Sequence, residues 1–153
     1  MTQLKIGDIV QIRTSKGFAY AQYIHKHPQY GALIRVLPNI YDAPVHDYLQ
    51  IAEESERFVV FFPLSAAVNK QIVSIVGNAP VPDFAKKFPT FRAGVADPAT
   101  GKVTTWWLWD GEKEWRVGDL TPEQRKMPIR GIWNDTLLIE RIESGWKPET
   151  DSA

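Results

Sequence analysis

The sequence predicts an α+β fold made mostly of antiparallel β-strands. Short runs of alternating apolar and polar residues recur along the chain, separated by glycine and proline turns. An Asp-Gly pair joins two tryptophan-rich runs, and helix-capping patterns follow them. We therefore expect an N-terminal small-barrel-like unit, a tryptophan-rich β-hairpin and two or three short helices. Residues 1–146 are predicted to form a single domain, and residues 147–153 a disordered polar tail.

The first half of the chain is predicted to be mainly β-structure. Three strands are expected within residues 5–37, where Ile6, Val10 and Ile12 alternate with polar residues along the first strand. Residues 45–57 are predicted to form either a short helix or an irregular edge. Further strands are expected at residues 58–62 and 72–76, and one helical turn at residues 84–88.

The second half is predicted to form a hairpin followed by helices. Strands are expected at residues 91–96, 103–109 and 112–117. Thr121, Pro122 and Gln124 form a capping-box pattern, which predicts a helix through about Met127. A second helix is predicted to begin at Asn134 or Asp135, to place Leu137, Leu138 and Ile142 on one face, and to end at Gly145.

The Asp110-Gly111 pair predicts a two-residue hairpin turn, which fixes the strand register. In this register Trp106 lies opposite Trp115, Trp107 opposite Glu114, and Trp109 opposite Glu112. The face with Trp106 and Trp115 is then the core face. An extra residue at Gly101, in a bulge, is predicted to place Phe91, Ala93 and Val95 on this same core face.

The opposite face of the hairpin mixes tryptophans with charged side chains, as protein-binding surfaces do. The predicted binding residues are Trp107, Trp109, Arg92, Arg116, Glu112 and Glu114. An alternative stays open at this point, because a sheet in an α+β domain can be covered on both faces. Trp107 and Trp109 would then be structural.

Composition narrows the possible functions and locations. The chain has no cysteine, and its 18 basic residues equal its 18 acidic residues, which weighs against nucleic acid as the partner. The N-terminal residues lack the apolar run of a signal peptide, and the longest apolar stretch, residues 58–64, is too short to span a bilayer. We expect a cytoplasmic protein without a membrane segment.

No catalytic pattern stands out in the sequence. His25 and His27 are predicted to share one face, but His46 is distant and no further metal ligand is placed near them, so we expect solvated loop histidines. No phosphate-binding loop and no nucleophile elbow is present. We predict no enzymatic activity, no metal and no cofactor. An enzyme is the third alternative, because carboxylates distant in sequence can converge.

Several segments resemble the immunity protein 26 family of bacterial polymorphic-toxin systems. They are KIGDIVQIRTSKGFAYAQYI, FFPLSAAVNKQIVSIVGNAPVP and WWLWDGEKEWRVGDLTPEQRKMPIRGIWNDTLLIERIESGW, which together cover roughly residues 4–146. The resemblance implies an immunity protein that neutralises a cognate toxin by binding it, with no catalytic residues. The alternative is a barrel-type module that binds nucleic acid or a peptide. It would use the tyrosines and cations Tyr20, Tyr23, Tyr30, Lys16, Lys26 and Arg35.

Overall fold

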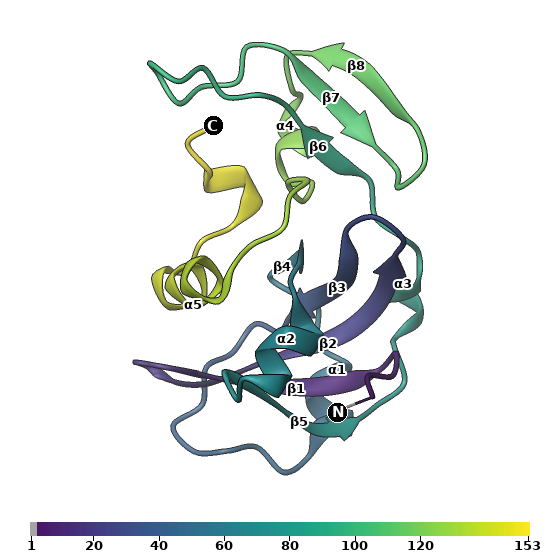
Figure 1. Cartoon of the computed structure of the whole chain (residues 1–153), viewed down its shortest axis with the longest axis vertical. Helices are drawn as coiled ribbons and strands as arrows, with labels where there is room; N and C mark the ends of the chain where they lie inside the picture. The colour runs from purple at the N-terminus through teal and green to yellow at the C-terminus, as the bar shows by residue number, and fades with distance from the viewer. Residues whose placement is uncertain (1–2) are drawn as a thin grey trace. The chain divides into compact units, whose positions relative to one another are not determined.

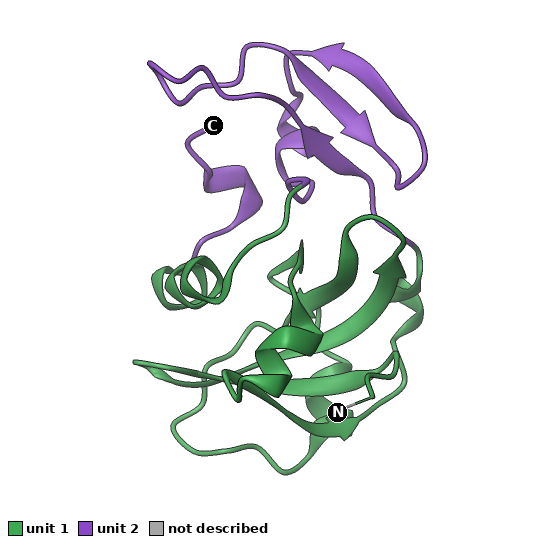
Figure 2. Ribbon diagram, in the orientation of Figure 1, with its two compact units in different colours: residues 1–87, 131–145 green, residues 88–130, 146–153 purple. Residues whose placement is uncertain are grey.

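The computed structural model describes residues 3–153 and has an α+β fold, with antiparallel strand ladders in two sheets (Figure 1). The predicted fold class is therefore confirmed. The chain divides into two compact units (Figure 2): residues 1–87 with 131–145, and residues 88–130 with 146–153. The sequence predicts a single domain over residues 1–146, and the proline-rich segment 79–89, which includes the boundary at residue 87, is interpreted as a connector within it. Each unit is described by itself.

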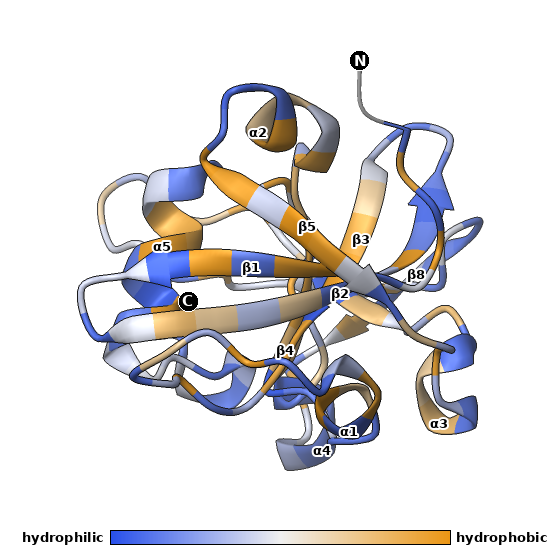
Figure 3. Cartoon of the chain, turned by 90° about the horizontal axis from the view of Figure 1, so that it is seen from below, coloured by the Kyte–Doolittle hydropathy of each residue, from blue (hydrophilic) through white to orange (hydrophobic). Residues whose placement is uncertain are grey.

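The first unit contains a five-stranded sheet in the order β4-β3-β2-β1-β5. Its strands are β1 (Asp8–Thr14), β2 (Gly17–His27), β3 (Gly31–Val36), β4 (Phe58–Phe61) and β5 (Val73–Asn78). These confirm the strands predicted in this part of the chain. The sheet is open in the described residues, with β4 and β5 at its edges, so the expected small barrel does not close. Figure 3 shows how apolar residues recur along β1 and β5.

Four helices belong to the first unit: α1 (Tyr48–Ala52), α2 (Leu64–Asn69), α3 (Asp83–Lys86) and α5 (Asp135–Ser144). The predicted limits of α5 are confirmed. The Asn134 Oδ1 atom accepts a hydrogen bond from the Leu137 N–H at 2.8 Å, and Gly145 ends the helix with a φ of 73°. Helix α2 was not predicted; it follows Pro63 without a side-chain cap. Within residues 3–153, no helix combines the length and the apolar character that a membrane span requires.

A fully buried arginine ties together separate segments of the first unit. The Arg35 Nε atom donates to Gln22 Oε1 at 2.8 Å, and its Nη1 atom donates to the Glu54 carbonyl at 2.8 Å. Its Nη2 atom donates to the Ala52 carbonyl. Gln22 in turn donates to the Ala79 carbonyl at 2.8 Å. These bonds join β2 and β3 to the end of α1 and to the segment after β5.

The Arg35 network gives the first stability prediction. Arg35→Met removes the donors and leaves several buried acceptors without partners, so we expect the free energy of unfolding to fall by about 3 kcal/mol. Arg13→Met, at an exposed arginine in the same unit, should change it by less than about 0.5 kcal/mol. Urea denaturation measures both values. Equal losses in the two variants would contradict the role assigned to Arg35.

The second unit contains a three-stranded sheet in the order β6-β7-β8. Its elements are β6 (Phe91–Ala93), β7 (Trp106–Trp109), β8 (Glu114–Gly118), α4 (Pro122–Arg125) and the 3-10 helix η1 (Pro148–Thr150). Strands β6 and β7 are shorter than predicted. The predicted capping box is confirmed: the Gln124 N–H donates to Thr121 Oγ1 at 3.2 Å, and the Thr121 N–H donates to Gln124 Oε1 at 2.9 Å.

The C-terminal tail is structured where the sequence predicts a disordered segment. Pro148 is buried, and its carbonyl accepts a hydrogen bond from Arg92 Nη2 at 2.8 Å. The Trp146 indole N–H donates to Asp151 at 3.1 Å. The prediction relied on the polar composition of residues 147–153. That composition does not indicate that the buried guanidinium of Arg92 binds the backbone of this segment.

Candidate functional site

The hairpin of the second unit turns through a longer loop than the sequence predicts. The loop between β7 and β8 comprises the four residues 110–113, and the Asp110 N–H donates to the Lys113 carbonyl across it at 3.1 Å. The Asp110 Oδ1 atom accepts from the Lys113 N–H at 2.8 Å and from the Glu112 N–H at 3.0 Å. These two hydrogen bonds lower the pKa of the Asp110 carboxyl, and the bond from the Lys113 N–H has the larger effect. Gly111 lies within the loop with a φ of 101°.

The longer loop shifts the register of the hairpin. Trp109 pairs with Glu114, Leu108 with Trp115, and Trp107 with Arg116. The predicted pairing of Trp106 with Trp115 is therefore wrong. Because directly opposed residues point to the same face, Trp115 shares a face with Leu108, and Glu114 and Arg116 share the other face with Trp107 and Trp109.

Arg92 is buried and does not belong to the predicted binding surface. It pairs with Leu108 and therefore lies on the face opposite Trp107. Its guanidinium donates to the Arg125 and Pro148 carbonyls at 2.8 Å each, and it lies 5.0 Å from the centroid of the Trp106 ring. Burial lowers its pKa, and the charge of Arg125 lowers it further. The sequence placed Arg92 beside Trp107 because it predicted a bulge at Gly101. In the structure Phe91 pairs with Trp109 and Ala93 pairs with Trp107, so Phe91 and Ala93 lie on the Trp107 face and Arg92 does not.

Trp109 is also buried, so its assignment to the binding surface was wrong. Only 6% of the residue is exposed. Its ring centroid lies 5.3 Å from that of Phe91 and 5.8 Å from that of Phe88, and the Arg130 guanidinium lies 5.5 Å from it. The sheet is covered on both faces at this position, which is the structural alternative that the sequence left open.

The other four predicted binding residues are exposed. Trp107 has 37% of its surface exposed, and Glu112, Glu114 and Arg116 are exposed as well. Trp115, which the sequence assigned to the core, is 42% exposed on the opposite face. The hairpin therefore does carry two exposed tryptophans, but they are Trp107 and Trp115.

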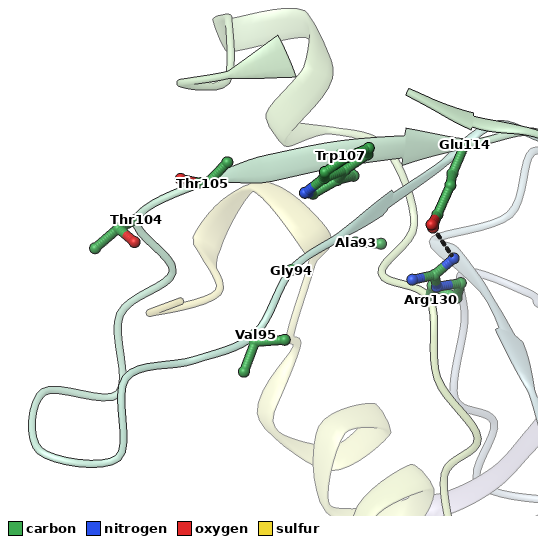
Figure 4. Close-up of a pocket in the computed structure, with 8 residues that line it drawn as sticks. All are labelled: Ala93, Gly94, Val95, Thr104, Thr105, Trp107, Glu114 and Arg130. Carbon is green, nitrogen blue, oxygen red and sulfur yellow. Dashed lines mark hydrogen bonds and ion pairs between the residues drawn. The ribbon is translucent and has the colours of Figure 1, made fainter. Parts of the chain in front are cut away.

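A shallow cavity of about 410 Å³ lies beside Trp107 (Figure 4). Its lining residues all belong to the second unit: Ala93, Gly94, Val95, Thr104, Thr105, Trp107, Glu114 and Arg130. The Arg130 Nη1 atom donates to Glu114 Oε2 at 2.9 Å. Val95 is 89% exposed at the other end of the cavity. The site thus combines an indole, a branched apolar side chain, hydroxyl groups and an ion pair.

Sequence reasoning missed Arg130 as a member of this site. The Arg130 N–H donates to the Arg92 carbonyl at 2.9 Å, and the Arg92 N–H donates to the Pro128 carbonyl at 2.8 Å. These bonds hold the segment after α4 against β6 and bring Arg130 to Glu114. No local pattern in the sequence indicates this contact, because the residues are far apart along the chain.

The structure gathers no cluster that could hold a metal ion. Within residues 3–153, no three His, Cys, Asp or Glu side chains converge for this purpose. His27 is buried rather than solvated, and its Nδ1 atom accepts from the Gln29 and Tyr30 N–H groups at 3.1 and 3.2 Å. Burial lowers the pKa of His25. Both histidines lie in β2, so the expectation of solvated loop residues was wrong.

Three of the six residues of the alternative nucleic-acid or peptide site are buried. Tyr20, Tyr23 and Arg35 are each at most 5% exposed. The Tyr20 hydroxyl donates to Gln11 at 2.9 Å and accepts from the Val45 N–H at 2.7 Å. The Lys16 ammonium donates to the Glu143 carbonyl at 2.9 Å. Tyr20 and Tyr23 therefore offer no open aromatic platform, whereas Lys16 and Lys26 are exposed and Tyr30 is half-buried.

Comparisons of the chain with protein-family models, with curated proteins and with solved structures found no match. The resemblance to the immunity protein 26 family therefore stays a prediction.

The different burial of two neighbouring tryptophans can be tested directly. Trp109→Ala removes a ring from an aromatic cluster, and we expect the free energy of unfolding to fall by about 3–5 kcal/mol. Trp107→Ala, two residues away on the same face, should cost about 1 kcal/mol or less. Chemical denaturation followed by circular dichroism measures both. A larger loss from Trp107→Ala would contradict the assignment of this residue to the surface.

Proposed function

We propose that this chain is a protein-binding domain that neutralises a cognate bacterial toxin by direct binding, through the surface around Trp107. The exposed indole beside a cavity is the observation that carries the proposal. Tryptophan is enriched among residues that dominate binding energy, because it offers a large rigid apolar area at little entropic cost. Below, the Trp107 surface means Trp107, Val95, Glu114, Arg116 and Arg130.

The charges around Trp107 support a protein partner. Glu114 and Arg130 form an ion pair whose side chains are 50% and 27% exposed. An ion pair this open to water contributes little stability by itself. A partner that excludes water from it would strengthen the pair, and its own charges could add hydrogen bonds to either member. Arg116 and Glu112 add one charge of each sign at the rim.

The choice of a toxin as the partner rests on the sequence resemblance. Immunity proteins act by covering a toxin, and they need an anchored contact surface but no catalytic groups. A neutral chain with an aromatic and charged patch suits this task better than it suits nucleic acid, which favours a basic surface. We propose that the interaction takes place in the bacterial cytoplasm.

Affinity capture with matched variants tests the proposal. The tagged chain is incubated with extract of the native host, and retained proteins are identified for the wild type, for Trp107→Ala and for Trp115→Ala. We expect one protein to be retained by the wild type and by Trp115→Ala but lost with Trp107→Ala, because a removed anchor costs about 2 kcal/mol or more, which is about thirtyfold in affinity. Trp115 is a close control, since it is an exposed tryptophan on the other face of the same hairpin.

The toxin assignment needs a separate readout. Expression of the captured protein in a laboratory bacterium should arrest growth, and co-expression of the wild-type chain should restore it, whereas Trp107→Ala should not. A captured protein without toxicity would refute toxin neutralisation while keeping the Trp107 surface as a binding site. Retention of the same proteins by all three chains would refute the surface itself.

A further inference from the structure

Among residues 3–153, strand β8 forms a free edge of the sheet in the second unit. The strand order β6-β7-β8 gives β8 a partner on one side only, and Figure 1 shows it as the outer strand of this sheet. The opposite edge is different, because β6 is bonded to the segment at Pro128 and Arg130. A free edge presents backbone donors and acceptors to any strand that can align with it.

The register of the hairpin decides which backbone groups this edge presents. The bond from the Asp110 N–H to the Lys113 carbonyl sets the alternation of the ladder. Leu108 and Trp115 then form a hydrogen-bonded pair, and the flanking pairs do not exchange hydrogen bonds. Glu114 and Arg116 therefore direct their backbone N–H and C=O groups away from β7, toward the free edge.

The charges on either side of Trp115 favour the pairing of β8 with a second β8 strand. Glu114, Trp115 and Arg116 are all exposed, and the two charges on either side of the tryptophan are opposite. In an antiparallel pairing of two such strands centred on Trp115, each Glu114 lies opposite the Arg116 of the second copy. Opposite charges in directly opposed positions stabilise a strand pair, and like charges destabilise it. A shift of the centre to Glu114 would set two carboxylates against each other.

We propose that β8 pairs antiparallel with β8 of a second copy of this chain, in register about Trp115. Glu114 and Arg116 of the two copies exchange backbone hydrogen bonds in this arrangement. Trp115 occupies the non-hydrogen-bonded position between them, where opposed Cα atoms approach to about 4.5 Å and side chains contact most closely. The two exposed indoles cover each other there, and the two three-stranded sheets become one continuous sheet.

The proposed contact is compatible with the interactions within each chain. Arg130 binds the Oε2 atom of Glu114, and the Oε1 atom can accept from Arg116 of the second copy. Trp107 lies on β7 and takes no part in the strand pairing. The proposal does not depend on the function proposed above.

The interface is small, because β8 runs only from Glu114 to Gly118. It buries less than the roughly 1,600 Å² of a standard interface, so we expect a weak, concentration-dependent dimer.

Charge reversal with rescue tests this pairing by sedimentation equilibrium over a range of concentrations. Arg116→Glu sets a second carboxylate against Glu114 of the other copy, and we expect the dimer dissociation constant to rise about tenfold or more. Glu114→Arg should have a similar effect by opposing two guanidinium groups. The double variant Glu114→Arg/Arg116→Glu restores opposite charges across the interface, and its dissociation constant should return to within about threefold of the wild-type value.

The contact shares Glu114 and Arg116 with the Trp107 surface, and two further variants distinguish it from binding through Trp107 itself. Trp115→Ala should weaken the dimer about tenfold, whereas Trp107→Ala should leave its dissociation constant unchanged. Arg116→Glu is the most informative single variant, because Arg116 forms no ion pair within residues 3–153 of its own chain. Glu114→Arg, in contrast, also removes the ion pair with Arg130. Thermal unfolding checks that each variant is folded. A wild-type chain that stays monomeric up to about 1 mM, or a double variant as weak as Arg116→Glu, would overturn the proposal.

Discussion

The four-residue hairpin loop, held by the Asp110 carboxylate, is the constraint on which the architecture of the second unit depends. Its hydrogen bonds to the Glu112 and Lys113 N–H groups offset the strands from the register that a two-residue turn would give. That offset brings Glu114 opposite Trp109, where it meets Arg130. It also places Trp115 at an exposed position on the opposite face. The candidate binding surface and the free edge of β8 therefore have the same physical origin.

Each unit also contains a fully buried arginine, and both serve the same structural purpose. Arg35 and Arg92 donate mainly to backbone carbonyls of segments that no strand ladder joins to the sheet. A buried guanidinium is costly to desolvate, and the burial lowers the pKa of both side chains. The hydrogen bonds offset that cost and specify where the loops and the C-terminal segment pack. Neither arginine is available to a partner.

Local sequence patterns predicted those parts of the structure that local interactions determine. Strands β1 to β3 follow from alternation and turns, and the caps at Thr121 and Asn134 follow from side-chain chemistry. The binding residues were predicted less well, because burial depends on register and on distant contacts. The Asp110-Gly111 pair favours a tight turn, yet side-chain bonds to the next two N–H groups favour the longer loop. Arg92 and Arg130 take positions that only the tertiary fold determines.

Nuclear Overhauser effects between backbone Hα protons test the hairpin register most directly. In antiparallel strands these protons approach closely at non-hydrogen-bonded pairs. The register described here predicts strong effects between Trp109 and Glu114 and between Trp107 and Arg116. A two-residue turn at Asp110-Gly111 would instead give a strong effect between Trp106 and Trp115. Observation of that contact would contradict both the assignment of Trp107 as the exposed anchor and the proposed pairing of β8.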